Sequence, residues 1–141
     1  MRHRDRFMAA DTPAPRKDDY PAAGRRLYQD GDHLWAERRY GSATHLFGLA
    51  AECAIKAAMK NVPPSDRKLP HEHLPELLTQ ARRLGWGRRY QGLLQLIAHA
   101  EYMDGWYINN RYWPDGAFDE ASCTRFRDHA RRTLIASGVP I

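Results

Sequence analysis

Apolar side chains recur every three or four positions along most of the chain, a spacing that places them on one face of an α-helix. This pattern predicts five helices: over about residues 21–39, over 41–61, from between 71 and 74 to 84, over 87–103 and over 119–138. No segment alternates apolar and polar residues for long enough to indicate a strand. Short connections between consecutive helices, from the second to the fifth, favour antiparallel neighbours. We therefore expect an all-α fold, an up-and-down antiparallel bundle of four to five helices.

Turn and cap residues set the predicted ends of these helices. Pro21 suits a first helical position, the Pro63–Pro64 pair ends the second helix, and Asp119 is placed to cap the last one. Gly24 and Gly31 each cost the first helix up to about 1 kcal/mol relative to alanine. The second helix is rich in alanine, so a neighbouring helix can approach it closely.

Composition is that of one globular domain. The 141 residues are 43% hydrophobic and 28% charged, enough for a core that needs no metal or disulfide. Residues 1–19 lack apolar periodicity and predict a mobile N-terminal arm, followed by the bundle over 20–138.

The two cysteines, Cys53 and Cys123, are too few for a disulfide framework and indicate reduced thiols; a single disulfide between them is the alternative. With no run of about 20 apolar residues and no apolar signal region, we expect a cytoplasmic protein.

Charge and aromatic residues point to an anionic partner. The 22 Lys and Arg against 17 Asp and Glu give a net charge of +5, a modest excess that attracts polyanions. Segment 104–114 gathers four aromatic rings around two asparagines and Arg111. Such rings stack on bases, and a guanidinium binds phosphate through two hydrogen bonds. The alternative, favoured for Trp106 and Tyr112, is that the rings cap the open end of the bundle.

The last predicted helix carries a basic face. Arg125, His129 and Arg132 follow one another at helical spacing. Beside Arg111 this face would extend a phosphate-binding track; otherwise it is a solvated surface.

A polar row is predicted on the second helix. His45, Glu52 and Lys56 fall within about 60° of one another at 100° per residue. Glu52 and Lys56, four residues apart, are oriented for an ion pair. One interpretation is a structural pair beside the alanine-rich face; the other is that Glu52 and His45 belong to a polar pocket in a dimer groove.

Three segments together resemble HEPN domains. Residues 43–57, Ala-Thr-His-Leu-Phe-Gly-Leu-Ala-Ala-Glu-Cys-Ala-Ile-Lys-Ala, look like the second helix of that family. His73–Leu74 is similar to its next segment, and Trp106 followed by Arg111–Tyr112 resembles its later tryptophan and Arg-Tyr pair. The resemblance implies a compact helical bundle, usually dimeric, over residues 20–138.

The same resemblance implies a set of functions. The family includes metal-independent ribonucleases, toxins paired with small nucleotidyltransferases, and non-catalytic binders of nucleotide or RNA. Its ribonucleases carry an Arg and a His separated by four to six residues, in which His moves protons and Arg stabilises charge at phosphorus. At the late position expected for that motif, this chain has only Arg125 and His129, one residue too close together. Earlier Arg–His pairs are as frequent as chance predicts.

These observations favour a HEPN-like homodimer that binds nucleotide or RNA through Arg111, Tyr112, Trp106 and Arg132, with a nucleotidyltransferase as partner in a toxin–antitoxin-type pair. One alternative is a metal-independent endoribonuclease toxin that uses Arg125 and His129. Another is a purely structural dimerisation module. We expect no metal and no cofactor, because cysteine pairs, zinc-ligand spacing and glycine-rich phosphate loops are missing from the sequence.

Overall fold

Helices account for the regular secondary structure of residues 16–141, the part of the chain that the computed structural model describes. Its five α-helices are α2 (Tyr20–Ala36), α3 (Tyr40–Met59), α4 (Glu76–Arg83), α5 (Gln91–Ala98) and α6 (Glu120–Ala136). Three short 3₁₀ helices are η1 (Arg88–Tyr90), η2 (Ile108–Tyr112) and η3 (Asp115–Ala117). No strand occurs among these residues, so the predicted all-α class is confirmed.

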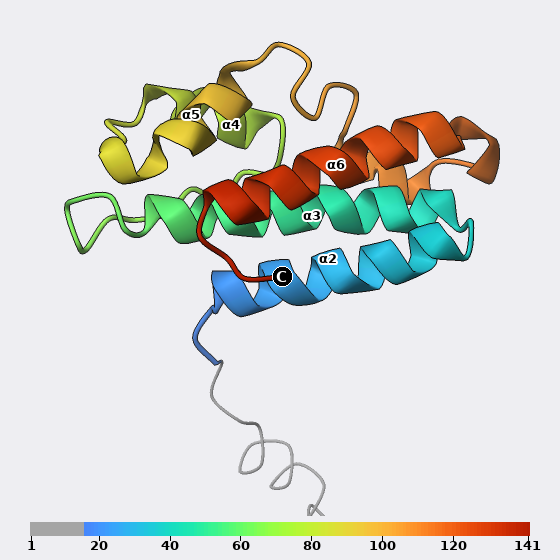
Figure 1. Ribbon diagram of the computed structural model, residues 1–141, viewed down its shortest axis with the longest axis horizontal. Helices are drawn as coiled ribbons and strands as arrows, with labels where there is room; N and C mark the ends of the chain where they lie inside the picture. The colour runs from blue at the N-terminus through green and yellow to red at the C-terminus, as the bar shows by residue number, and fades with distance from the viewer. Residues whose placement is uncertain (1–15) are drawn as a thin grey trace, which may run out of the picture.

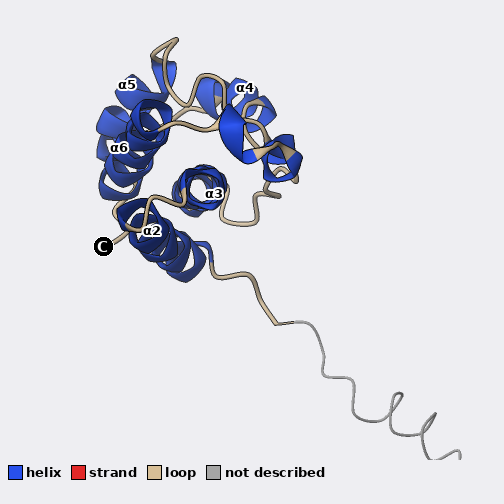
Figure 2. Cartoon of the chain, turned by 90° about the vertical axis from the view of Figure 1, so that its right-hand side faces the viewer, coloured by secondary structure: helices blue, strands red, loops and turns tan. Residues whose placement is uncertain are grey.

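Helix α3 lies at the centre of the molecule, with α2, α6 and the α4–α5 region around it (Figure 2). Its alanines 43, 50, 51, 54 and 58 are fully buried, as the close approach of neighbouring helices requires. Gly31 of α2 faces α3 as well, where a Cβ atom would lie 2.9 Å from the ring of Phe47. The predicted helical cost of Gly31 is therefore offset by the packing that a missing side chain allows.

The direction of α6 departs from a simple up-and-down order. Helices α2 and α3 are antiparallel, whereas α6 runs in the same direction as α3 (Figure 1). Both helices begin at the same end of the molecule, where the Tyr40 hydroxyl donates to Glu120 Oε1 over 2.9 Å. The long segment between α5 and α6 returns the chain to that end, which the short connections assumed in an up-and-down bundle would not do.

The two middle helices are shorter than the sequence predicts. α4 begins only at Glu76, because a residue that precedes proline, here Leu74, disfavours helical backbone angles. The predicted fourth helix, 87–103, was wrong in extent: α5 ends at Ala98 and His99 has an extended ψ of 134°. The chain turns there and buries Tyr102, whose hydroxyl lies 2.6 Å from Thr133 Oγ1 in α6. Tertiary packing thus overrides the local helical pattern.

The ends of the chain bear on three further expectations. Of the predicted N-terminal arm, residues 1–15 lie outside the described part; residues 16–19 carry no helix, and the Asp19 carboxylate caps α2 by accepting from the Ala22 N–H over 3.0 Å. Cys53 and Cys123 are both free thiols, so no bridge joins them. None of the helices described here combines the length and apolar character needed to cross a membrane.

Candidate functional site

The segment that follows α5 is fastened to α3 by Trp106. The indole Nε1 donates a 2.8 Å hydrogen bond to the backbone carbonyl of Thr44. The ring fills the space above Gly48, where a Cβ atom would lie 1.8 Å from Trp106 Cε2. Only 1% of Trp106 is exposed, so neither face of its ring is open to a base. In this position Trp106 closes the bundle and fixes the backbone that leads into η2.

A second contact between the same segments joins Asn110 of η2 to His45 of α3. Asn110 Oδ1 lies 3.1 Å from His45 Nδ1. Because an amide oxygen only accepts, Nδ1 carries the hydrogen and Nε2 is left as an acceptor. Burial lowers the pKa of His45, and the nearby charge of Arg111 lowers it further. The imidazole is therefore neutral at pH 7 and offers a lone pair.

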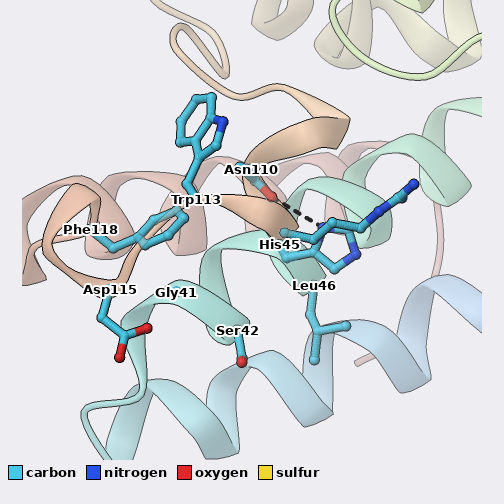
Figure 3. A pocket seen from close by; sticks show the side chains of 9 residues that line it. Gly41, Ser42, His45, Leu46, Asn110, Trp113, Asp115 and Phe118 are labelled. Atoms are coloured by element: carbon cyan, nitrogen blue, oxygen red, sulfur yellow. Dashed lines mark hydrogen bonds between the residues drawn. The ribbon is translucent and has the colours of Figure 1, made fainter.

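These contacts place Arg111 at the rim of a hollow of about 280 Å³, which we call the Arg111 pocket. Figure 3 shows its lining around the start of α3 and the 3₁₀ segments η2 and η3. Its residues are Gly41, Ser42, His45, Leu46, Asn110, Arg111, Trp113, Asp115 and Phe118. The volume is close to the lower limit of about 300 Å³ for small-molecule sites.

One side of the Arg111 pocket is aromatic. The rings of Trp113 and Phe118 lie 6.1 Å apart with an angle of 25° between their planes, so they form a nearly continuous apolar surface. Gly41 of α3 makes room for this surface, since a Cβ atom there would come within 3.1 Å of Phe118. A planar heterocycle can pack against such a surface through its face.

The polar side of the pocket combines a cation with acceptors. The Arg111 guanidinium lies 4.8 Å from the ring centre of Tyr112, which holds it by a cation–π contact. Tyr112 itself is 74% exposed and does not line the pocket. The Asp115 carboxylate and His45 Nε2 are acceptors for the hydroxyl or amino groups of a ligand. The arrangement suits a ligand with an anionic group, a planar ring and hydrogen-bond donors.

The basic face of α6 lies elsewhere. His129 and Arg132 line a separate hollow of about 180 Å³, together with residues that follow α5, and Arg111 has no part in it. Arg132 is paired with Asp128 at 3.1 Å. Arg111 and the α6 face therefore line different hollows.

Arg125 and His129 are both engaged in structural contacts. Arg125 donates to the backbone carbonyl of Asp104 over 3.0 Å, and its guanidinium lies 4.4 Å from the ring centre of Phe126. His129 Nδ1 accepts the Met103 backbone N–H over 3.0 Å. Burial lowers the pKa of His129, and Arg125 contributes in the same direction. These contacts anchor the turn after α5 to α6.

Glu52 and Lys56 form a buried ion pair on α3. Lys56 Nζ lies 3.4 Å from Glu52 Oε2, and the residues are 4% and 6% exposed, respectively. Glu52 Oε1 lies 2.8 Å from His73 Nδ1, on the segment before α4. The pair therefore links that segment to α3, while His45 of the same row belongs to the Arg111 pocket.

Among residues 16–141 no group of three or more His, Cys, Asp or Glu side chains is placed to hold a metal ion.

Several residues of the Arg111 pocket were not predicted from the sequence. Phe118 and Asp115 come from the connection before α6, and Gly41 and Ser42 from the start of α3. An aromatic residue next to the helix cap Asp119 is a weak signal for Phe118. Nothing in the local pattern indicates that this connection returns to the start of α3.

No protein-family model, no curated protein and no solved structure matches this chain. The resemblance to HEPN domains thus stays a prediction from the residues that carry it.

Proposed function

We propose that this protein is a HEPN-like binding module for nucleotide or RNA and that its binding site is the Arg111 pocket. The observation that carries the proposal is the placement of a guanidinium, an aromatic surface and hydrogen-bond acceptors around one hollow. In this proposal a phosphate pairs with Arg111 and a base packs on Trp113 and Phe118. The Asp115 carboxylate accepts a hydrogen bond from a hydroxyl or amino group of the ligand. The docked Trp106 supports the proposal because it holds this lining in place without the ligand.

The experiment is a calorimetric titration of the full chain with each of the four ribonucleoside monophosphates. We expect measurable binding of at least one, and a loss of about tenfold or more in Arg111→Ala, since a hydrogen bond to a charged group contributes about 1.5–3 kcal/mol. Arg83→Ala is the matched control, because Arg83 is an exposed arginine on α4 that lines none of the hollows described above. Equal affinities of Arg111→Ala and the unchanged chain would overturn the proposed site.

The homodimer is a further part of the proposal. Tyr107 and Tyr112 are exposed aromatic side chains on the segment that carries Arg111, and exposed aromatic area of this kind favours a protein contact. Light scattering at micromolar concentration is expected to give twice the mass of the chain. A monomer at that concentration would contradict the proposed homodimer.

The proposal of a nucleotidyltransferase partner rests on the resemblance alone. It is tested by co-purification with the product of a neighbouring gene.

Salt dependence separates this proposal from the alternative of a purely structural dimerisation module. Non-specific attraction to RNA falls steeply with ionic strength and is not competed by single nucleotides. Binding in a shaped pocket is competed by the nucleotide that fits it. We expect competition to persist at about 150 mM salt, where non-specific attraction of a modestly basic protein is largely screened.

A further inference from the structure

The Arg111 pocket continues into a second hollow at the turn between α2 and α3. This hollow, of about 390 Å³, is lined by Arg38, Arg39, Tyr40, Gly41, Ser42, Asp115 and Phe118. The last four residues also line the Arg111 pocket. The two hollows therefore form one groove, which runs from η2 past the start of α3 to the α2–α3 turn.

Cationic side chains stand at both ends of this groove. Arg111 occupies one end, and Arg38 and Arg39 occupy the other. Arg38 has a φ of 63°, a left-handed backbone that side chains other than glycine, asparagine and aspartate rarely adopt. Neither Arg38 nor Arg39 forms an ion pair with a described residue. Their guanidinium groups are thus available to an anion in the groove.

The middle of the groove has different chemistry. Asp115 and Phe118 lie where the two hollows meet. A carboxylate repels a phosphate but accepts a hydrogen bond from a hydroxyl, and the Phe118 ring offers an apolar face. A ligand with an anionic group at each end of the groove, and a sugar and a base between these groups, matches this arrangement.

We infer that the groove binds an unpaired RNA strand of at least two phosphates. One phosphate pairs with Arg111 and another with Arg38 and Arg39, while the base between them packs on Trp113 and Phe118. Asp115 accepts from a ribose 2′-hydroxyl, the group by which proteins distinguish RNA from DNA. A base in a duplex is stacked and paired and cannot enter a hollow of this size, so the strand is single. This inference rests on the proposed function and names the substrate class of the same site.

The test compares a single ribonucleotide with a single-stranded RNA tetranucleotide by calorimetric titration. We expect the tetranucleotide to bind the unchanged chain about tenfold or more tighter than the mononucleotide. The double variant Arg38→Asn with Arg39→Gln should lose that gain and keep its mononucleotide affinity within about twofold. Asparagine is chosen at position 38 because it tolerates a left-handed backbone. Arg83→Ala is again the matched control, and circular dichroism checks that every variant is folded.

Salt provides a second measurement of the same contacts. The slope of log affinity against log salt is about 0.7 for each phosphate that a single strand places on a cation. In the double variant we expect the tetranucleotide slope to fall by about that amount. Duplex RNA of matching sequence should bind at least tenfold more weakly than the single strand, and single-stranded DNA about fivefold more weakly.

The outcomes separate the inference from the proposed function. If the mononucleotide binds and the double variant binds the tetranucleotide like the unchanged chain, the groove does not extend to the turn and the inference is overturned, while the Arg111 pocket stands. Equal binding of duplex or of DNA overturns the assignment to unpaired RNA. If no mononucleotide binds and Arg111→Ala changes nothing, the proposed function itself fails.

Discussion

The indole nitrogen of Trp106 is hydrogen-bonded to the backbone carbonyl of Thr44, a residue 62 positions earlier in the chain. One turn further along α3, Gly48 leaves the space that the indole ring occupies. This contact fixes the start of the segment that carries Asn110 and Arg111, and Asn110 makes a second contact with α3 through His45 at 3.1 Å. The geometry of the candidate site therefore depends in part on a glycine that does not line the Arg111 pocket.

Gly48→Ala should destabilise the protein strongly. A Cβ atom 1.8 Å from Trp106 Cε2 forces the indole out of its place, because the nearest obstacle is a rigid ring. Overpacking of this kind costs about 1–3 kcal/mol, and loss of the hydrogen bond to Thr44 adds about 1 kcal/mol. We expect the free energy of unfolding, measured in urea, to fall by about 3 kcal/mol.

Gly92→Ala is the matched control for that substitution. Gly92 lies in α5, and no atom comes within 4 Å of a Cβ placed there. Alanine in a helix is favoured over glycine by about 0.5–1 kcal/mol, so this variant should be slightly more stable. If Gly48→Ala were as stable as Gly92→Ala, Trp106 would not be packed as described.

Helices that bury one continuous face were predictable from sequence. α3 and α6 begin and end within a few residues of their predicted bounds, because their apolar periodicity and the Asp119 cap are local signals. The early end of α5 was not predictable. It follows from Tyr102 turning towards Thr133 of α6, a contact between residues 31 positions apart.

The candidate site was predictable only in part, for the same reason. Arg111 stands out because local sequence surrounds it with aromatic rings. The placement of Phe118 beside Gly41 depends instead on the shared direction of α3 and α6, which the predicted up-and-down order excluded. Local pattern also did not indicate the contacts of Arg125 with Asp104 and of His129 with Met103, since it gives the face of a helix but not the neighbour that covers it.

Removing Glu52 and removing Lys56 from the buried pair on α3 should lower the free energy of unfolding by unequal amounts. Glu52→Gln leaves the Lys56 ammonium buried without the opposite charge of Glu52, next to a neutral amide oxygen and the Tyr20 ring 5.9 Å away. Lys56→Met leaves Glu52 its contact with His73 at 2.8 Å. Removing one partner of a buried pair costs about 3–5 kcal/mol when the other charge is left uncompensated. We expect a loss of about 3 kcal/mol for Glu52→Gln and a smaller loss for Lys56→Met in urea unfolding.

The double variant Glu52→Gln with Lys56→Met completes that cycle. It removes both charges, so it should be more stable than Glu52→Gln alone. Additive losses in the double variant would show that the two side chains do not interact.

RNA cleavage by Arg125 and His129 is not expected. Arg125 is bonded to the Asp104 carbonyl, and His129 Nδ1 accepts the Met103 N–H, so both groups already serve the turn after α5. Mixed RNA incubated with the protein and EDTA should stay intact on a gel over a concentration series. Cleavage that persists in EDTA and disappears in His129→Ala would instead establish the ribonuclease alternative.

Stability should decline in mild acid because of His129. Burial keeps the pKa of His129 below its usual 6.5 in the folded state, so the unfolded chain takes up the proton first. The contribution of neutral His129 is complete above about pH 6.5 and is lost as pH falls below that value, because a protonated Nδ1 cannot accept the Met103 N–H. In His129→Gln, urea unfolding at pH 7 and pH 5 should differ less than in the unchanged chain. An identical pH dependence in both proteins would show that the pKa of His129 is the same in the folded and unfolded states.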